Sequence, residues 1–191
     1  MIVSVLFLAI PIWVVVDALQ SRDIRVYVCP GGLLYLHGGK TEAMRWDQVE
    51  SFWRKIVKTS SYGIQTGTTH RYTLRRSDGA TFTFNDNIGN VEALGNTIAE
   101  ETARMLWPRY IAAYQAGQIL AFGKISLNQQ GVNNGKEWLP WYQVREIRIN
   151  RGYLSFKKEG DKQGRVILAA EIPNLDVFLA LVNGIQSGKY R

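Results

Sequence analysis

The chain has 191 residues, a formal net charge of +7 and one cysteine, Cys29. Hydrophobic residues make up 46% of it and charged residues 20%, which excludes a disordered chain and allows one or two globular domains. The single cysteine excludes an intramolecular disulfide and is typical of a reducing compartment.

The chain starts with an apolar segment. Residues 2–19 are interrupted only by Ser4 and Asp17, and nothing basic precedes them. As a helix, a segment of this length reaches about 28 Å, close to the roughly 30 Å of a bilayer core. We therefore predict a transmembrane anchor over residues 1–21 that contacts the membrane through residues 2–19. A cleaved signal peptide and a packed helix or strand are the alternatives, but a signal peptide normally has a basic start and a small-residue cleavage site.

The next basic residues predict an orientation. Arg22 and Arg25 lie just after the apolar segment. Positive charges that flank a membrane helix favour the cytoplasmic side, and the unpaired Cys29 agrees with that side. The sequence therefore predicts a single-pass protein of the cell membrane with a cytoplasmic body.

Short strands and turns dominate the region after the apolar segment. A hairpin is expected around Ser77-Asp78-Gly79, and a polar, glycine-bearing loop is expected over residues 59–69. Strands are predicted from apolar runs and alternation at residues 25–28, 33–36, 42–46, 49–57, 70–76 and 80–85.

A helical period follows these strands. From Val91 onward, apolar residues recur at helical spacing, and Asn87 or Asn90 can cap the start. Pro108 is expected to begin a second helical piece that ends at Gly117. The sequence therefore predicts a helix in two pieces.

The second part of the chain repeats this order of elements. Its final helix is expected from about Asn174 to Ile185, because the apolar residues there lie on one stripe. Its strands are predicted at residues 124–127, 131–133, 136–139, 144–150, 153–157 and 165–170.

One eight-residue pattern occurs twice. Residues 45–52 read RWDQVESF and residues 140–147 read PWYQVREI, and both fit Trp-x-Gln-Val-x-x-apolar. A pattern that recurs within the same order of elements predicts two copies of one small domain. We place the first domain, with an extended connecting helix, at residues 22–117 and the second at residues 118–191.

The repeated tryptophans and valines are predicted to be structural anchors. An aromatic ligand platform is the alternative for the tryptophans. Because duplicated domains share structure most, packing of each tryptophan against the helix of its own domain is favoured. The anchors are Trp46, Val49, Trp141 and Val144.

Four motifs carry a resemblance to a known family: Arg45–Val49, Thr81–Asp86, Ile149–Tyr153 and Ile172–Leu175. In these motifs the chain resembles a bacterial family of membrane-anchored proteins with tandem PH-like domains, over about residues 24–187. The resemblance implies a mainly β fold with some helix (α+β). In this fold an N-terminal transmembrane helix precedes two PH-like barrels, each of short antiparallel strands capped by a C-terminal helix. It implies membrane association and no particular activity.

No residue pattern indicates catalysis, a metal or a cofactor. His37, His70 and Cys29 match no metal-ligand spacing. The glycine pairs lie in hairpins rather than between a strand and a helix, where a phosphate-binding loop would lie. Carboxylates are scattered and do not pair for acid–base chemistry. We therefore expect a non-catalytic protein without a metal or cofactor.

Basic residues gather in one hairpin region of the second predicted domain. In the first, Arg71 and Arg75 share a strand face. Phosphoinositide-binding PH domains carry a basic motif across the first hairpin, where this chain has only Lys40 in the first unit. We predict a diffuse attraction to anionic lipid, with a solvated face as the alternative. The candidate contacts are Arg148, Arg151, Lys157, Lys158, Lys162 and Arg165.

These patterns predict a membrane-anchored binding or scaffolding protein whose modules contact anionic lipid headgroups. The alternative is a module for a protein partner or for a homo-oligomer, with no lipid role. Nucleic acid is the least expected ligand, because no dense Lys/Arg run occurs and the Tyr and Trp residues alternate into strands as core residues do.

Overall fold

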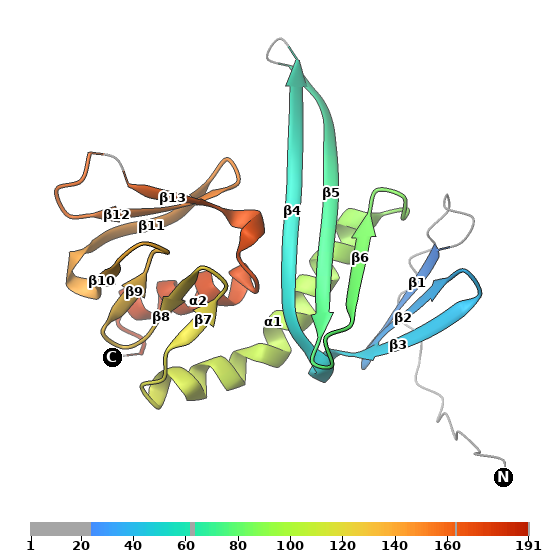
Figure 1. Cartoon of the computed structure of the whole chain (residues 1–191), viewed down its shortest axis with the longest axis horizontal. Helices are drawn as coiled ribbons and strands as arrows, with labels where there is room; N and C mark the ends of the chain where they lie inside the picture. Colours follow the sequence, from blue (N-terminus) through green and yellow to red (C-terminus); the bar gives the residue numbers. More distant parts are fainter. Residues whose placement is uncertain (1–23, 62–63, 163, 191) are drawn as a thin grey trace.

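In the N-terminal half (residues 24–117), the strands form two antiparallel sheets that are followed by a long helix (Figure 1). The computed structural model describes residues 24–61, 64–162 and 164–190. The elements are β1 (Ile24–Cys29), β2 (Gly32–His37), β3 (Lys40–Arg45), η1 (Trp46–Gln48), β4 (Val49–Ser61), β5 (Ile64–Arg76), β6 (Thr81–Asn85) and α1 (Val91–Gln115). The sheet orders are β1-β2-β3 and β4-β5-β6, and the 3-10 turn η1 leads from one sheet into the other.

The C-terminal half (residues 118–190) contains a four-stranded sheet, a three-stranded sheet and a second helix. Its elements are β7 (Leu120–Phe122), β8 (Ile125–Leu127), β9 (Gly131–Asn133), β10 (Trp138–Pro140), η2 (Trp141–Gln143), β11 (Val144–Asn150), β12 (Tyr153–Lys158), β13 (Arg165–Leu168), η3 (Ala169–Glu171) and α2 (Leu175–Gln186). The sheet orders are β10-β9-β8-β7 and β11-β12-β13. In both halves, strands precede a 3-10 turn, three strands follow it and a helix comes last; the second half has the additional turn η3 before its helix. The interpretation of the halves as two copies of one domain stays a prediction.

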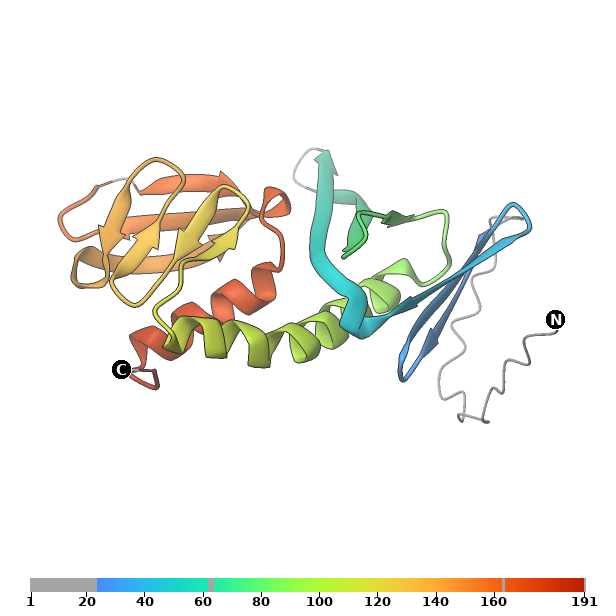
Figure 2. The ribbon, with the colours of Figure 1, turned by 60° about the horizontal axis from the view of Figure 1, so that its bottom comes forward.

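Each half has its own hydrophobic core, and α1 contributes to both. The N-terminal part of α1 buries Leu94 and Ile98 among the strands of the first half. Its C-terminal part packs Leu106 and Tyr114 into the core of the second half, whose centre includes the fully buried Phe178. Figure 2 shows α1 running beneath both halves. The helix therefore joins the two cores into one structure.

The predicted fold class, with an N-terminal transmembrane helix before two PH-like barrels, is wrong. The described strands form four small sheets of three or four strands each, and none of these sheets closes on itself. The turns η1 and η2 start a new sheet after β3 and after β10, because the chain there bends instead of pairing onward. The structure is mostly β with two helices among its described residues.

The predicted single-pass membrane location with a cytoplasmic body is also not supported. No helix among residues 24–61, 64–162 and 164–190 combines the length and the apolar character that a membrane span needs. The longest one, α1, has 25 residues but carries charged side chains such as Glu100, Glu101 and Arg104. The segment predicted as an anchor, residues 1–21, lies outside the described residues.

Two local predictions differ from the structure. The expected polar loop over residues 59–69 is instead the far part of a long hairpin, in which β4 pairs with β5 up to Ser61 and Ile64 (Figure 1). Its threonines favour extended backbone, and the ladder hydrogen bonds satisfy the peptide groups that face the partner strand. The helix expected to break at Pro108 is continuous. Packing of α1 into both cores outweighs the cost of the interior proline, about 3 kcal/mol.

A glycine in α1 allows the helix to approach the sheet closely. A Cβ at Gly95 would fall inside the ring of Tyr72, which is fully buried. We expect Gly95→Ala to lower the free energy of unfolding by about 1–3 kcal/mol, although alanine is the better helix former, because the ring has no free space to move into. Urea unfolding followed by circular dichroism measures this loss.

The matched control for this prediction is Gly184→Ala in α2. A Cβ there would meet the ring of Tyr190, which is only half-buried and can turn aside. We expect Gly184→Ala to be neutral or stabilising, since it gains helix propensity without trapping a ring. Equal losses at both glycines would contradict the packing argument.

Candidate anion-binding surface

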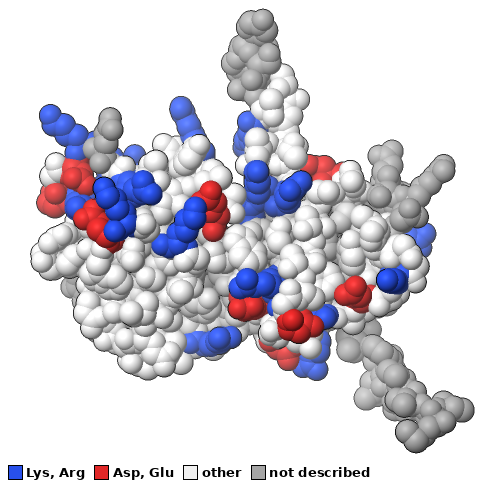
Figure 3. All heavy atoms as spheres, in the orientation of Figure 1, with Lys and Arg blue, Asp and Glu red and all other residues white. Residues whose placement is uncertain are grey.

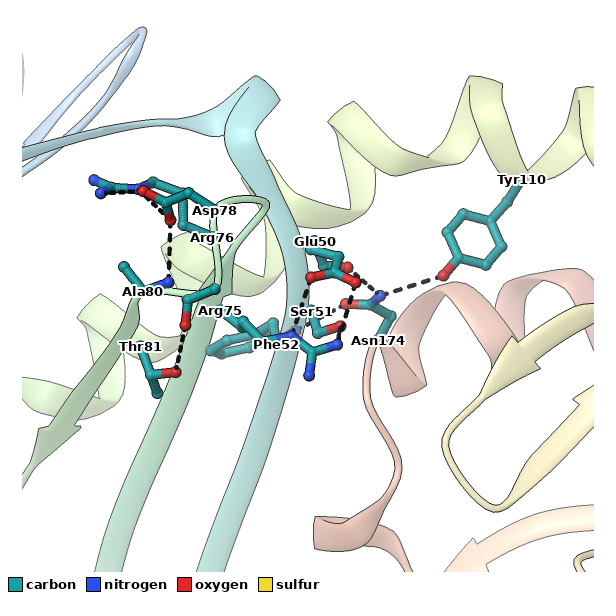
Figure 4. A network of polar contacts seen from close by, with 11 residues as sticks. Glu50, Ser51, Phe52, Arg75, Arg76, Asp78, Ala80, Thr81, Tyr110 and Asn174 are labelled. Carbon is teal, nitrogen blue, oxygen red and sulfur yellow. Dashed lines mark hydrogen bonds and ion pairs between the residues drawn. The ribbon is translucent and has the colours of Figure 1, made fainter.

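A single buried asparagine connects the second half to the free edge of β4. Asn174 has a left-handed backbone (φ 52°) just before α2. Its backbone N–H donates to the Phe52 carbonyl (2.8 Å), and its Oδ1 accepts from the Phe52 N–H (2.9 Å). Its Nδ2 donates to the Glu50 carbonyl (3.0 Å) and to the Tyr110 hydroxyl (3.4 Å), as Figure 4 shows. Asn174 therefore pairs with β4 much as a neighbouring strand would.

This junction places η3 beside the outer face of the β4-β5-β6 sheet, the face that points away from the core. Because side chains alternate along strands, Trp53 and Lys55 of β4 share this face with Arg71, Thr73 and Arg75 of β5. Together with Thr81 and with Ala170 of η3 they line a depression of about 330 Å³. The two halves of the chain therefore both contribute to the depression.

Two cations on this face have no partner among the described residues. Arg75 is held in place, because its Nε and Nη2 donate to the Glu50 carboxylate (3.1 and 3.2 Å) and its guanidinium lies 5.4 Å from the centre of the Trp53 ring. Lys55 and Arg71, in contrast, are direct partners in the β4-β5 ladder and are both exposed. Neither side chain forms an ion pair or hydrogen bond with any described residue. Like charges directly opposite each other destabilise a sheet.

The outer face of the β11-β12-β13 sheet is the second basic surface. A depression of about 320 Å³ is lined there by two arginines, two polar side chains, one tyrosine and one valine: Arg148, Arg151, Asn150, Ser155, Tyr153 and Val166. Glu146 is shared between Arg148 (3.1 Å) and Lys157 (3.8 Å), so one carboxylate meets two cations. Arg151 lies in the turn between β11 and β12 with φ 49°. This face therefore keeps an excess of positive charge.

The six predicted surface contacts do not lie on one face. Arg148 and Lys157 lie on the outer face and Arg151 at its turn. Lys158 points to the other side and donates to Glu137 (2.9 Å); this hydrogen bond raises the pKa of Lys158 and lowers the pKa of Glu137. Arg165 pairs with Phe156, so it shares the core side of the sheet, and Lys162 lies in the loop before β13.

The basic side chains of both halves are visible from one side of the molecule. Figure 3 shows Lys and Arg on the β4-β5 hairpin and also over the second half, in the orientation of Figure 1. Sequence reasoning noted Arg71 and Arg75 but missed Trp53 and Lys55. Trp53 and Lys55 alternate along β4, as Arg71 and Arg75 do along β5. The strand register, which the sequence does not give, is needed to place all four on one face.

The anchor tryptophans make equivalent hydrogen bonds but differ in burial. The indole of Trp46 donates to the Cys29 carbonyl (3.2 Å) and that of Trp141 to the Asn128 carbonyl (2.9 Å). Trp46 is 2% exposed, whereas Trp141 is half-buried. Val49 is 3% exposed, whereas Val144 is half-buried.

A pocket of about 850 Å³ lies over Trp141. Four aromatic side chains contribute to its wall: Tyr114, Trp141, Tyr142 and Tyr190. The helices explain the difference from Trp46, because α1 has 25 residues and packs on η1, whereas α2 has only 12. The shorter helix leaves the second tryptophan accessible.

Within the part of the chain that the structure describes, no group of three or more His, Cys, Asp or Glu side chains is arranged to hold a metal ion. The resemblance to tandem PH-like proteins stays a prediction. Comparison with curated proteins gives no match. The model of a family of unknown function, DUF6585, matches residues 1–191, so the chain belongs to this family.

Proposed function

We propose that the protein is a non-catalytic binding module that contacts anionic lipid headgroups through its two basic sheet faces. The observation that carries this proposal is the surplus of cations over carboxylates on both faces, with Lys55 and Arg71 on one and Arg148 and Arg151 on the other. Each basic residue close to an anionic membrane surface contributes about 1 kcal/mol to binding. Several such residues together therefore give useful affinity.

The connection between the halves supports joint action of the two faces. Tyr153 pairs with Leu168 at the end of β13, and Ala170, two residues later, lines the depression beside Trp53. The hydrogen bonds of Asn174 hold this junction in place. Two weak contacts on one rigid support bind with a higher effective concentration than either contact alone.

A binding role also fits the chemistry of these faces. Their carboxylates, Glu50 and Glu146, are engaged by Arg75 and by Arg148 and Lys157. A general acid or base needs a carboxylate or imidazole free to reach a substrate. We therefore propose recognition of charge and not turnover.

Vesicle co-sedimentation with the full chain tests the proposal. We expect stronger binding to phosphatidylcholine vesicles that contain phosphatidylserine than to phosphatidylcholine alone, and loss of this difference at high salt. The double variant Arg148→Ala/Arg151→Ala should weaken the binding to anionic vesicles about thirtyfold, since it removes two contacts of about 1 kcal/mol each.

A matched control removes the same charge from a different sheet. Arg25→Ala/Lys40→Ala takes two exposed cations from β1 and β3. This variant should keep the preference for anionic vesicles. If both double variants lose the same affinity, net charge and not a particular face drives binding. If the wild type binds both kinds of vesicle equally, the proposal fails.

A protein-interaction or oligomerisation role is the second candidate function. Three large apolar side chains are exposed on the same outer face: Tyr153 (48%), Val166 (53%) and Leu168 (36%). A cluster of this kind is a feature of protein interfaces. Light scattering of the wild type against Val166→Ser distinguishes the two roles. A concentration-dependent mass that this variant reduces, without vesicle binding, would favour the interface.

A further inference from the structure

Lys55 and Arg71 form an exposed like-charge pair across the β4-β5 ladder. They face each other across β4 and β5, and no described carboxylate neutralises them. Elsewhere on the same face, Arg75 has Glu50 as its partner. Because like charges directly opposite each other destabilise a sheet, an anion bound between Lys55 and Arg71 would relieve their repulsion.

The surroundings of the pair suit a small, highly charged group. The depression around them also presents the Trp53 ring and the hydroxyl groups of Thr73 and Thr81. Lysine offers a compact point charge and arginine a planar fork of N–H donors, and both are common partners of phosphate. The Thr73 hydroxyl adds a neutral donor at the rim, whereas the Thr81 hydroxyl donates to the Gly79 carbonyl (3.5 Å).

The geometry points to a phosphate monoester as the ligand of the Lys55–Arg71 pair. Two unpaired positive charges match the charge of a monoester, which approaches −2 at neutral pH because its second pKa is about 6. A phosphate diester carries only −1 and would leave one cation without a partner. This inference rests on the proposed function where the monoester belongs to a lipid headgroup, and it stands by itself where the monoester is a free molecule.

Matched soluble and vesicle probes test the inference. For the full chain, calorimetry should show binding of glycerol 3-phosphate, a monoester, at least tenfold tighter than of glycerophosphoglycerol, a diester. In vesicles at equal lipid charge, phosphatidic acid should be preferred over phosphatidylglycerol. Between pH 5 and pH 7.5 the preference should grow, as the second proton leaves the monoester.

Two sets of variants locate the preference. Lys55→Ala and Arg71→Ala should each weaken monoester binding about tenfold and leave diester binding unchanged. Arg148→Ala/Arg151→Ala should weaken binding to both kinds of vesicle but keep the monoester preference. Lys55→Ala should also raise the melting temperature of the free protein, because it removes the repulsion. At one ligand concentration, glycerol 3-phosphate should then stabilise the wild type more than this variant.

Each outcome has a distinct meaning. A monoester preference in solution without any vesicle binding would support the phosphate site and refute the proposed lipid function. A preference on vesicles alone would identify a lipid headgroup as the source of the phosphate. Equal binding of monoester and diester by the wild type, or a preference unchanged in both Lys55→Ala and Arg71→Ala, would overturn the inference.

Discussion

Trp46→Ala is expected to lower the free energy of unfolding by about 3–5 kcal/mol, while Trp141→Ala should cost about 1–2 kcal/mol. Trp46 is 2% exposed, and its removal leaves a cavity in the first core and an unpaired Cys29 carbonyl. Trp141 is half-buried at the mouth of a pocket, so water can replace part of its surroundings. Urea unfolding followed by circular dichroism measures both losses.

Phenylalanine variants separate packing from the indole hydrogen bond. Trp46→Phe should recover most of the apolar contact but not the donor to Cys29, and should therefore lie between the wild type and Trp46→Ala. Trp141→Phe should be close to the wild type. Equal losses at positions 46 and 141 would mean that the pocket over Trp141 is filled in solution.

The local elements could be predicted from the sequence because their signals are local. The helical period starting at Val91 and the apolar stripe near Asn174 place α1 and α2 within one residue of their observed starts. The turn at Ser77-Asp78-Gly79 also lies where expected, between β5 and β6. Arg76 stabilises this turn by hydrogen bonds to Asp78, which lower the pKa of this carboxyl to about 2.

The arrangement of the sheets depends on contacts that a sequence pattern does not report. Whether β3 pairs onward or the chain bends at Trp46 is decided by the packing of the turn under α1. The continuity of α1 through Pro108 likewise depends on two cores that lie at opposite ends of the helix. Periodicity indicates that a helix exists, but it does not weigh an interior proline against distant packing.

The candidate site depends on strand register for the same reason. The register of β4 and β5 shifts between Val49 and Ser51, and such a shift changes the face on which each following side chain lies. Only with that register known do Lys55 and Arg71 become opposite neighbours. In the second half, register also separates Lys157 from Lys158, although the two lysines are adjacent in the sequence. Clustering along the chain is therefore a poor guide to clustering in space.

Asn174→Gly is expected to destabilise the protein by about 1–3 kcal/mol, because the Phe52 N–H loses its buried acceptor and the Glu50 carbonyl loses a donor. Glycine keeps the left-handed backbone without strain, so this loss reports the side chain alone. Hydrogen exchange gives the most direct readout. The amide of Phe52 should exchange faster in the variant, while the amide of Leu74, in the core of the first half, should not change at low denaturant.

The chain contains a matched control for this change. Asn90 precedes α1 in the same left-handed conformation (φ 53°), but it is exposed and its side chain makes no cap hydrogen bond. Asn90→Gly should therefore alter the free energy of unfolding by less than about 0.5 kcal/mol. If the two asparagines respond alike, the backbone conformation and not the junction explains the loss. If only Asn174→Gly destabilises the protein, it should also weaken anionic vesicle binding, since the two basic faces are then held less firmly relative to each other.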